Sequence, residues 1–116
     1  MNSLYSSTVY IIIAMIFVVI SNLTEKGAET IAERPERIKM LNEELMKVGA
    51  KVKEQYLLFG DIDFINIVEV EDAEKFLKAM IELNSRGTVK TRSYLAIPVD
   101  RAIDVIKGLP SIGHPH

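Results

Sequence analysis

The feature that most constrains this chain is an unbroken apolar run near its start, from Val9 to Ile20. Its 12 residues are too few for a membrane-spanning helix, which needs about 20. A secretory signal is also disfavoured, because residues 1–7 contain no lysine or arginine and no small-residue cleavage motif follows the run. The run is rich in β-branched Ile and Val, which favour strands. We therefore expect a buried first strand and not a membrane anchor or an export segment.

The position of Met15 inside this run suggests where the domain begins. A chain that began at Met15 would open on a complete first strand. We therefore expect residues 1–14 to be an N-terminal extension, residues 15–110 to form a single domain and residues 111–116 to be a C-terminal tail. The length of 116 residues leaves room for one domain with one hydrophobic core.

The composition excludes several classes of function. The net charge is −2 and no lysine- and arginine-rich patch is interleaved with aromatic residues, so we expect no nucleic-acid partner. The chain has no cysteine, which excludes disulfides, thiolate nucleophiles and zinc–sulfur sites and fits the reducing cytoplasm. No glycine-rich phosphate loop or dinucleotide fingerprint occurs, so we expect no cofactor. Abundant Ile, Val, Glu and Lys suggest a thermophilic source.

The first half of the chain predicts a strand followed by two helical stretches. The strand covers residues 15–22, and Thr24 can cap the helix that follows it. Pro35 interrupts the helical pattern, since proline lacks the backbone N–H that a helix requires. A second helical stretch covers residues 35–48, with an apolar face at spacings of three and four residues.

The second half predicts a hairpin, a helix, a strand and a short final helix. Two strands at 51–59 and 62–70 are separated by Gly60-Asp61, a sequence typical of a two-residue hairpin turn. Asp72 begins a helix that Gly87 ends. The last strand covers 88–97, after which Asp100 would cap a helix that packs its apolar residues inward, namely Ala102, Ile103 and Ile106.

This order of elements, β-α-β-β-α-β with a C-terminal helix, predicts an α+β fold of the ferredoxin-like type, with an antiparallel sheet and both main helices on one face. The first and third strands should be central, and both are apolar on their two faces. Phe17 and Val19 point one way, whereas Val18 and Ile20 point the other way. One apolar sheet face therefore lacks a helical cover, and we expect a homodimer or a larger homo-oligomer to bury it.

Four stretches of the sequence carry a resemblance to a known family. They are Phe-Val-Val-Ile-Ser-Asn-Leu-Thr-Glu-Lys-Gly, Arg-Pro-Glu-Arg, Tyr-Leu-Leu-Phe-Gly-Asp-Ile-Asp-Phe-Ile-Asn-Ile-Val-Glu and Gly-Thr-Val-Lys-Thr-Arg. With these, the segment 16–110 resembles the GYD-domain family of small proteins of uncharacterised function. The resemblance implies a ferredoxin-like fold of the dimeric α/β-barrel type. At the position of the family's Gly-Tyr-Asp signature this chain reads Gly60-Asp61-Ile62-Asp63, so glycine and aspartate are present and the tyrosine is not.

The candidate ligand-binding residues are six polar side chains on or beside the predicted strands. Asn66 faces Gln55 across the hairpin, and the pair must be hydrogen-bonded if it is buried. The simplest interpretation is a bond at a dimer interface, and a ligand contact is the alternative. Lys90, Arg92 and Tyr94 share a face of an edge strand, either as a solvated edge or as an anion-binding patch. The full candidate set is Asn22, Tyr56, Asp63, Asn66, Arg92 and Tyr94.

Other polar residues have structural explanations that we favour. Asp61 and Asp63 flank the hairpin turn, where aspartate commonly bonds its own backbone. The only histidines, His114 and His116, lie on a Gly- and Pro-containing tail, so we predict no metal site and no catalytic residue.

We therefore favour a non-enzymatic, cytoplasmic, homo-oligomeric domain that binds a small ligand or acts through assembly, with no membrane partner. The competing hypothesis is a cofactor-independent enzyme, such as an isomerase or a monooxygenase-like protein. It would need a polar residue such as Asp63, Asn66 or Arg92 to point into a cavity between the sheet and the helices.

Overall fold

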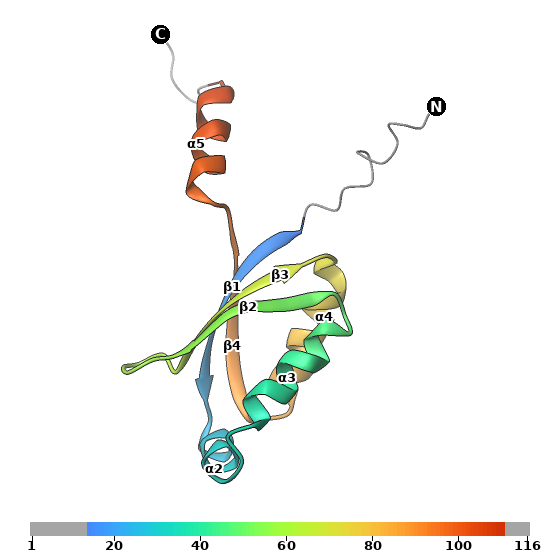
Figure 1. The fold of residues 1–116 in the computed structure, drawn as a ribbon, viewed down its shortest axis with the longest axis vertical. Helices are drawn as coiled ribbons and strands as arrows, with labels where there is room; N and C mark the ends of the chain where they lie inside the picture. The colour runs from blue at the N-terminus through green and yellow to red at the C-terminus, as the bar shows by residue number, and fades with distance from the viewer. Residues whose placement is uncertain (1–13, 111–116) are drawn as a thin grey trace.

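A four-stranded sheet covered by helices forms the body of the protein in the computed structural model, which describes residues 14–110 (Figure 1). Along the chain the elements are β1 (Met15–Leu23), α2 (Glu25–Glu33), α3 (Arg37–Met46), β2 (Ala50–Leu57), β3 (Phe64–Val70), α4 (Ala73–Ser85), β4 (Val89–Ala96) and α5 (Val99–Gly108). This order confirms the predicted α+β, ferredoxin-like class.

The strands are all antiparallel and lie in the order β2-β3-β1-β4. The first and third strands are therefore central, as predicted, and the second and fourth strands form the edges. The register pairs Phe17 with Val68 and Val19 with Asn66, so these side chains share one face of the sheet. The alternate residues of β1, including Val18 and Ile20, lie on the opposite face.

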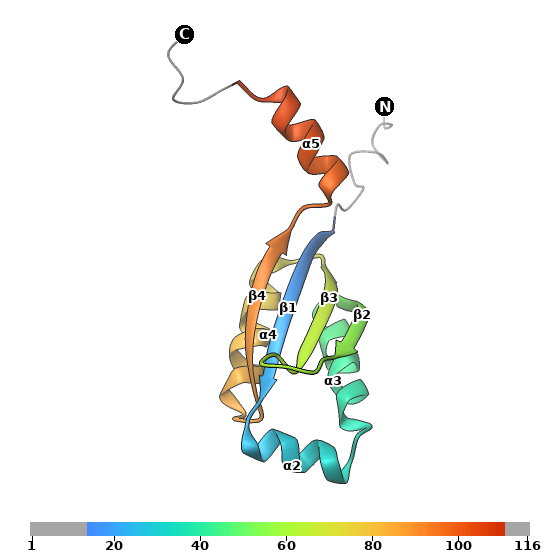
Figure 2. The same cartoon turned by 90° about the vertical axis from the view of Figure 1, so that its left-hand side faces the viewer.

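Helices α3 and α4 lie behind the same face of the sheet, which leaves the other face without a helical cover (Figure 2). The core lies between the helices and the sheet. Its largest fully buried side chains are those of Val68 and Val70, both on β3. The ring centroids of Phe17 on β1 and Phe76 on α4 are 5.1 Å apart. The other buried members of the core are Val19, Leu45, Ala50, Met80 and Leu83.

The hairpin between β2 and β3 has the predicted register but a longer loop than predicted. The ladder ends at the pair Leu57 and Phe64, and one further bond joins the Leu58 N–H to the Asp63 carbonyl oxygen at 2.8 Å. The loop does not close on two residues because its polar groups bond the end of β1. The Asp63 N–H, for example, donates to the Ser21 carbonyl oxygen at 3.1 Å. The prediction of a two-residue Gly60-Asp61 turn is therefore wrong.

A β-bulge in β2, which the sequence pattern did not indicate, sets which side chains of that strand face the helices. The register shifts between Val52, which pairs with Val68, and Glu54, which pairs with Ile67. Val52 and Gln55 are three positions apart and would lie on opposite faces of a regular strand. The extra residue, Lys53, places both of them on the helix-covered face.

The final helix differs most from the prediction. Helix α5 projects away from the body beyond the end of β4 (Figures 1 and 2), and none of its residues is buried. Ile106, expected to point into the core, is 73% exposed. Asp100 is also not the N-cap of this helix. The N-cap residue is Pro98, whose side chain has no group that could accept a hydrogen bond from the first turn. The inward packing of α5 is therefore wrong for the single chain.

Among residues 14–110, no helix combines the length and the apolar character that crossing a bilayer requires. The proposed N-terminal extension and the two histidines of the tail lie outside the described residues, apart from Ala14.

Candidate functional site

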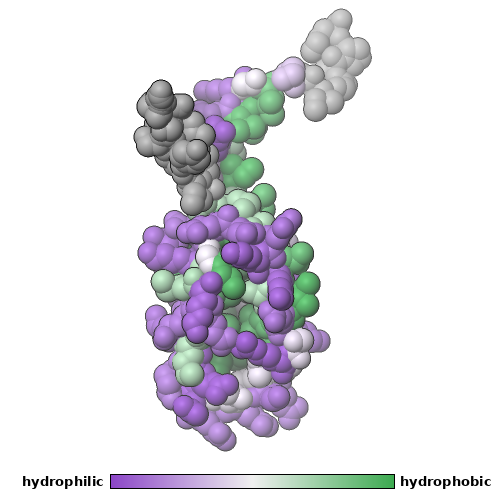
Figure 3. All heavy atoms as spheres, turned by 90° about the vertical axis from the view of Figure 1, so that its right-hand side faces the viewer, coloured by the Kyte–Doolittle hydropathy of each residue, from purple (hydrophilic) through white to green (hydrophobic). Residues whose placement is uncertain are grey.

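A cavity of about 390 Å³ lies between the helix-covered face of the sheet and helices α2, α3 and α4. Much of its wall is apolar and comes from the core, with Val68 on the sheet and Phe76 and Met80 on α4. Its volume lies within the range of small-molecule binding sites. Figure 3 shows the helix side of the molecule, where hydrophilic side chains dominate and hydrophobic atoms are visible between them in the middle of the body.

A chain of three amide side chains forms part of the cavity wall. Gln55 on β2 donates through Nε2 to Asn66 Oδ1 on β3 at 2.9 Å. It also exchanges two bonds with Asn42 on α3, because Asn42 Nδ2 donates to Gln55 Oε1 at 3.0 Å and Gln55 Nε2 donates to Asn42 Oδ1 at 3.3 Å. Asn66 Nδ2 in turn donates to the Val19 carbonyl oxygen at 3.1 Å. These bonds join the hairpin to α3.

The predicted pairing of Gln55 with Asn66 is confirmed, but the preferred explanation for it is wrong. The bonds lie within one chain and on the helix-covered face, not at an interface between two copies. The bulge after Val52 causes the difference, because it places Gln55 below α3. Asn42, which completes the group, was missed because it occupies the apolar side of a helix that the sequence pattern described only by its hydrophobic residues.

Ser21 is a second cavity residue that the sequence analysis missed. It is 7% exposed and lies on the cavity face of β1, paired with Phe64 on one side and Thr91 on the other. Within residues 14–110, no hydrogen bond is formed by its hydroxyl group. A buried hydroxyl without a partner is costly, since it loses its bonds to water. The signal was present in the sequence as one small polar residue among apolar ones on the same face of β1.

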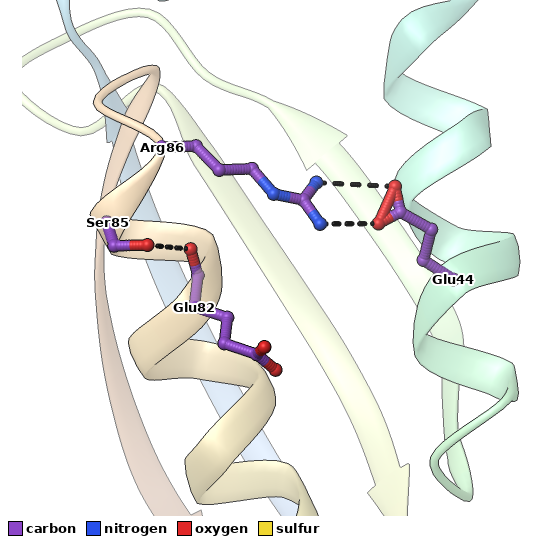
Figure 4. A network of polar contacts seen from close by, with 4 residues as sticks. All are labelled: Glu44, Glu82, Ser85 and Arg86. Atoms are coloured by element: carbon purple, nitrogen blue, oxygen red, sulfur yellow. Dashed lines mark hydrogen bonds and ion pairs between the residues drawn. The ribbon is translucent and has the colours of Figure 1, made fainter.

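The charged groups on the cavity wall are mostly basic. Lys26 on α2, Arg37 at the start of α3 and Arg86 after α4 are the basic groups, and Glu44 on α3 is the one acidic group among the described lining residues. Arg86 bonds both carboxylate oxygens of Glu44, at 2.8 and 3.3 Å (Figure 4). The guanidinium hydrogen bond lowers the pKa of Glu44 and raises the pKa of Arg86.

Helix α2 closes one end of the cavity because its first turn is attached to the turn between α4 and β4. The Thr24 N–H donates to the Thr88 carbonyl oxygen at 3.0 Å, and Thr24 Oγ1 donates to the Gly87 carbonyl oxygen at 2.6 Å. Thr24 Oγ1 also accepts from the Gly27 N–H at 3.1 Å, which confirms the predicted cap. Gly27 is buried because the Thr88 carbonyl occupies the space of a side chain.

Two of the predicted site residues attach the hairpin loop to the sheet. Asn22 Nδ2 donates to the Asp61 carbonyl oxygen at 2.7 Å. Asp63 Oδ2 accepts from the Leu23 N–H at 2.8 Å. Asp63 therefore has a structural partner on β1 and does not line the cavity, and its side chain bonds β1 instead of its own hairpin.

The three remaining candidates lie on the uncovered face of the sheet. Tyr56 pairs with Ile65, and Arg92 and Tyr94 pair with residues of β1 that point away from the helices. Tyr56 donates its hydroxyl hydrogen to Glu54 Oε1 at 2.9 Å, and this bond raises the pKa of the tyrosine. The structure thus separates the six candidates, and only Asn66 lines the cavity. Their role in ligand binding stays a prediction.

Within the described part of the chain, no three His, Cys, Asp or Glu side chains gather in a way that could hold a metal ion.

The fold and the cavity together define an α+β domain of the split β-α-β type, with one sheet face uncovered and a small cavity between the other face and the helices. The GYD domain model matches residues 17–106, and the chain belongs to the GYD domain family. A protein of Thermus thermophilus, named glutamine synthetase and cystathionine beta-lyase binding protein, is 49% identical over 92 residues, which is 78% of this chain and 97% of that protein. No solved structure matches the chain significantly.

Proposed function

We propose that this GYD-domain protein is a homo-oligomeric interaction domain that acts by binding other proteins. The observation that carries the proposal is the amount of apolar surface that the single chain leaves uncovered, on the open sheet face and on α5. Surfaces of this kind normally mark sites of protein association.

The open sheet face has an apolar centre and a charged edge on each side. The apolar side chains of the two central strands that point toward it are Ile16, Val18, Ile20, Ile65 and Ile67, with the polar residues Glu69 and Asn22 at its two ends. Tyr56 on β2 and Tyr94 on β4 flank them and are 55% and 51% exposed. We infer that a second copy of the chain covers this face, in a self-complementary pairing of two sheets.

The edges of the open face carry charges of both signs. Lys51 and Glu54 lie on the β2 edge, and Lys90 and Arg92 lie on the β4 edge. A two-fold axis parallel to the strands would place the β4 edge of one copy over the β2 edge of the other, and it would bring Glu54 toward the edge that carries Arg92. The apolar centre of the face, and not the charge of its edges, therefore carries the proposal.

Helix α5 is the second surface, and we propose that it binds a different protein. Val99, Ala102, Ile103 and Ile106 recur at the spacing of one helix face, and Val99 and Ile106 are each 73% exposed. An apolar helix face that projects from the body is suited to insert into a groove of a partner. The name of the Thermus relative makes glutamine synthetase and cystathionine beta-lyase the first candidates. We expect this binding to take place in the cytoplasm.

The experiment measures binding of the intact chain to immobilised glutamine synthetase and cystathionine beta-lyase by biolayer interferometry. The Ile103→Lys/Ile106→Lys variant should lose binding, because two charges on the α5 face would have to be buried. Asp104→Asn, on the opposite side of the same helix, should bind as the wild type does. Absence of saturable binding to both enzymes, or equal binding by the α5 variant, would contradict this part of the proposal.

A second candidate function, the binding of a small ligand, is favoured by a separate observation. The cavity below α2 and α3 holds the buried Ser21 hydroxyl without a partner in the described chain, beside core side chains that make much of the wall apolar. Ligand binding and protein binding can coexist, because the cavity and the open sheet face lie on opposite sides of the sheet.

A further inference from the structure

We propose that the cavity binds a small carboxylic acid with an apolar body, with its carboxylate at the end closed by α2. The inference rests on the second function proposed above and names the class of ligand. It depends on three properties of the cavity, namely its charge, its buried hydroxyl and the separation of its polar and apolar ends.

The charge of the cavity wall favours an anion. Glu44, the one acidic group among the described lining residues, is already engaged by both terminal nitrogens of Arg86. Lys26 and Arg37 also line the cavity, and neither forms an ion pair within residues 14–110. The described lining residues thus carry three positive charges and one negative charge, and the wall lacks a free acidic group that would repel an anion.

The buried hydroxyl lies at the same end of the cavity as these charges. Ser21 is three residues before Thr24, the cap of α2, so it lies where β1 runs into the helix that carries Lys26 (Figure 1). Arg37 begins the next helix, α3. A carboxylate placed there would accept a hydrogen bond from the Ser21 hydroxyl. It would also accept charge-assisted hydrogen bonds from Lys26, Arg37 or both. A hydrogen bond to a charged group is about twice as strong as one between neutral groups.

The other end of the cavity is apolar. Val68 on β3 and Phe76 on α4 are both buried and form this part of its wall. They lie beside Phe17, which is four residues before Ser21 on β1. Each of the three amide groups on the side of the wall, Gln55, Asn42 and Asn66, already forms at least two hydrogen bonds within the chain. Hydrocarbon is therefore the better occupant of this end, and its burial adds to the binding energy.

The test compares three probes of the same chain length by isothermal titration calorimetry on the intact protein. They are octanoate, octan-1-ol and octylammonium, which share an eight-carbon chain and carry an anionic, a neutral and a cationic head group. We expect saturable binding of one octanoate per chain, with at least about ten-fold weaker binding of the alcohol and weaker binding still of the ammonium.

Matched variants identify the site. Lys26→Gln/Arg37→Gln and Ser21→Ala should each weaken octanoate binding by about five-fold or more, because each removes part of the carboxylate contact. Lys78→Gln, which removes a charge from the exposed side of α4, should leave binding unchanged. The two cationic residues are on the cavity wall but not in the core, so their variant remains informative even if Ser21→Ala impairs folding.

The outcomes separate this inference from the proposals on which it rests. If octan-1-ol binds as tightly as octanoate, or if the Lys26/Arg37 variant binds octanoate normally, the carboxylate class is wrong although a ligand site exists. If none of the three probes binds saturably, both the class and the ligand-binding function are overturned. Neither result affects self-association or enzyme binding, which are measured with other variants.

Discussion

Replacement of Gly27 by alanine is the sharpest test of how α2 is placed over the end of the cavity. A Cβ atom at this position would lie 2.9 Å from the Thr88 carbonyl carbon and well inside the van der Waals envelope of the carbonyl oxygen. The carbonyl is backbone and cannot rotate away as a flexible side chain does. The helix must therefore move, which weakens the two bonds of Thr24 to the turn after α4.

The size of the effect follows from three contributions. Overpacking of this kind costs about 1–3 kcal/mol, and the weakened capping bonds cost about 1 kcal/mol. Alanine is a better helix former than glycine by about 1 kcal/mol, which offsets part of the loss. We expect Gly27→Ala to lower the free energy of unfolding by about 2 kcal/mol, a large part of the roughly 5–15 kcal/mol typical of such a domain.

Urea unfolding followed by circular dichroism measures this change, and Gly108→Ala is the matched control. Gly108 ends α5, and a Cβ atom there meets no other atom within 4 Å. The same chemical change should be neutral or slightly stabilising at that position. If the two variants have equal unfolding midpoints, α2 does not lie against the Thr88 carbonyl and this account of the cavity wall is wrong.

Three further predictions concern the core and its polar groups, each measured by urea unfolding against the wild type. Phe76→Ala should cost about 3–5 kcal/mol, because the ring is 2% exposed, and a cost below about 1 kcal/mol would refute its place in the core. Asn66→Ala should cost about 2–3 kcal/mol through the lost bonds to Gln55 and to the β1 backbone, and an unchanged midpoint would exclude this network. Arg86→Met should cost at most about 1 kcal/mol at neutral pH, because both partners are half-exposed. Since Arg86 lowers the pKa of Glu44, this stabilisation exists above the ordinary carboxyl pKa and should disappear as the pH falls through the lowered value. A cost of Arg86→Met that stayed constant in acid would contradict the assignment.

The order of elements and the division of β1 and β3 into two faces were predictable because both depend on local patterns. Alternation along Phe17, Val18 and Val19, and the capping residues Thr24 and Asp72, act over a few positions and need no tertiary information. The pairing of Gln55 with Asn66 was predictable for a similar reason, since residues near a hairpin turn are paired by their distance from it.

A cavity between the sheet and the helices was part of the competing hypothesis, but its lining could not be predicted because it depends on contacts between distant segments. The bulge after Val52 turns Gln55 toward α3, and the position of Asn42 on that helix then completes the amide group. Ser21 becomes a buried residue of the cavity wall only because α2 lies over the end of β1. The direction in which α5 projects could not be predicted either. Its apolar face is compatible with packing on the core of its own chain and with packing on another molecule.

The central claim is that a second copy of the chain covers the open sheet face, and the mass of the protein in solution tests it most directly. Light scattering should give at least twice the mass of one chain, 13.1 kDa, for the wild type. Val18→Lys, which places a charge at the centre of the open face, should reduce the mass to that of a single chain. Leu77→Lys, at a 61% exposed position on α4, should leave the mass unchanged. A wild-type chain that is monomeric at concentrations where it is folded would contradict the account.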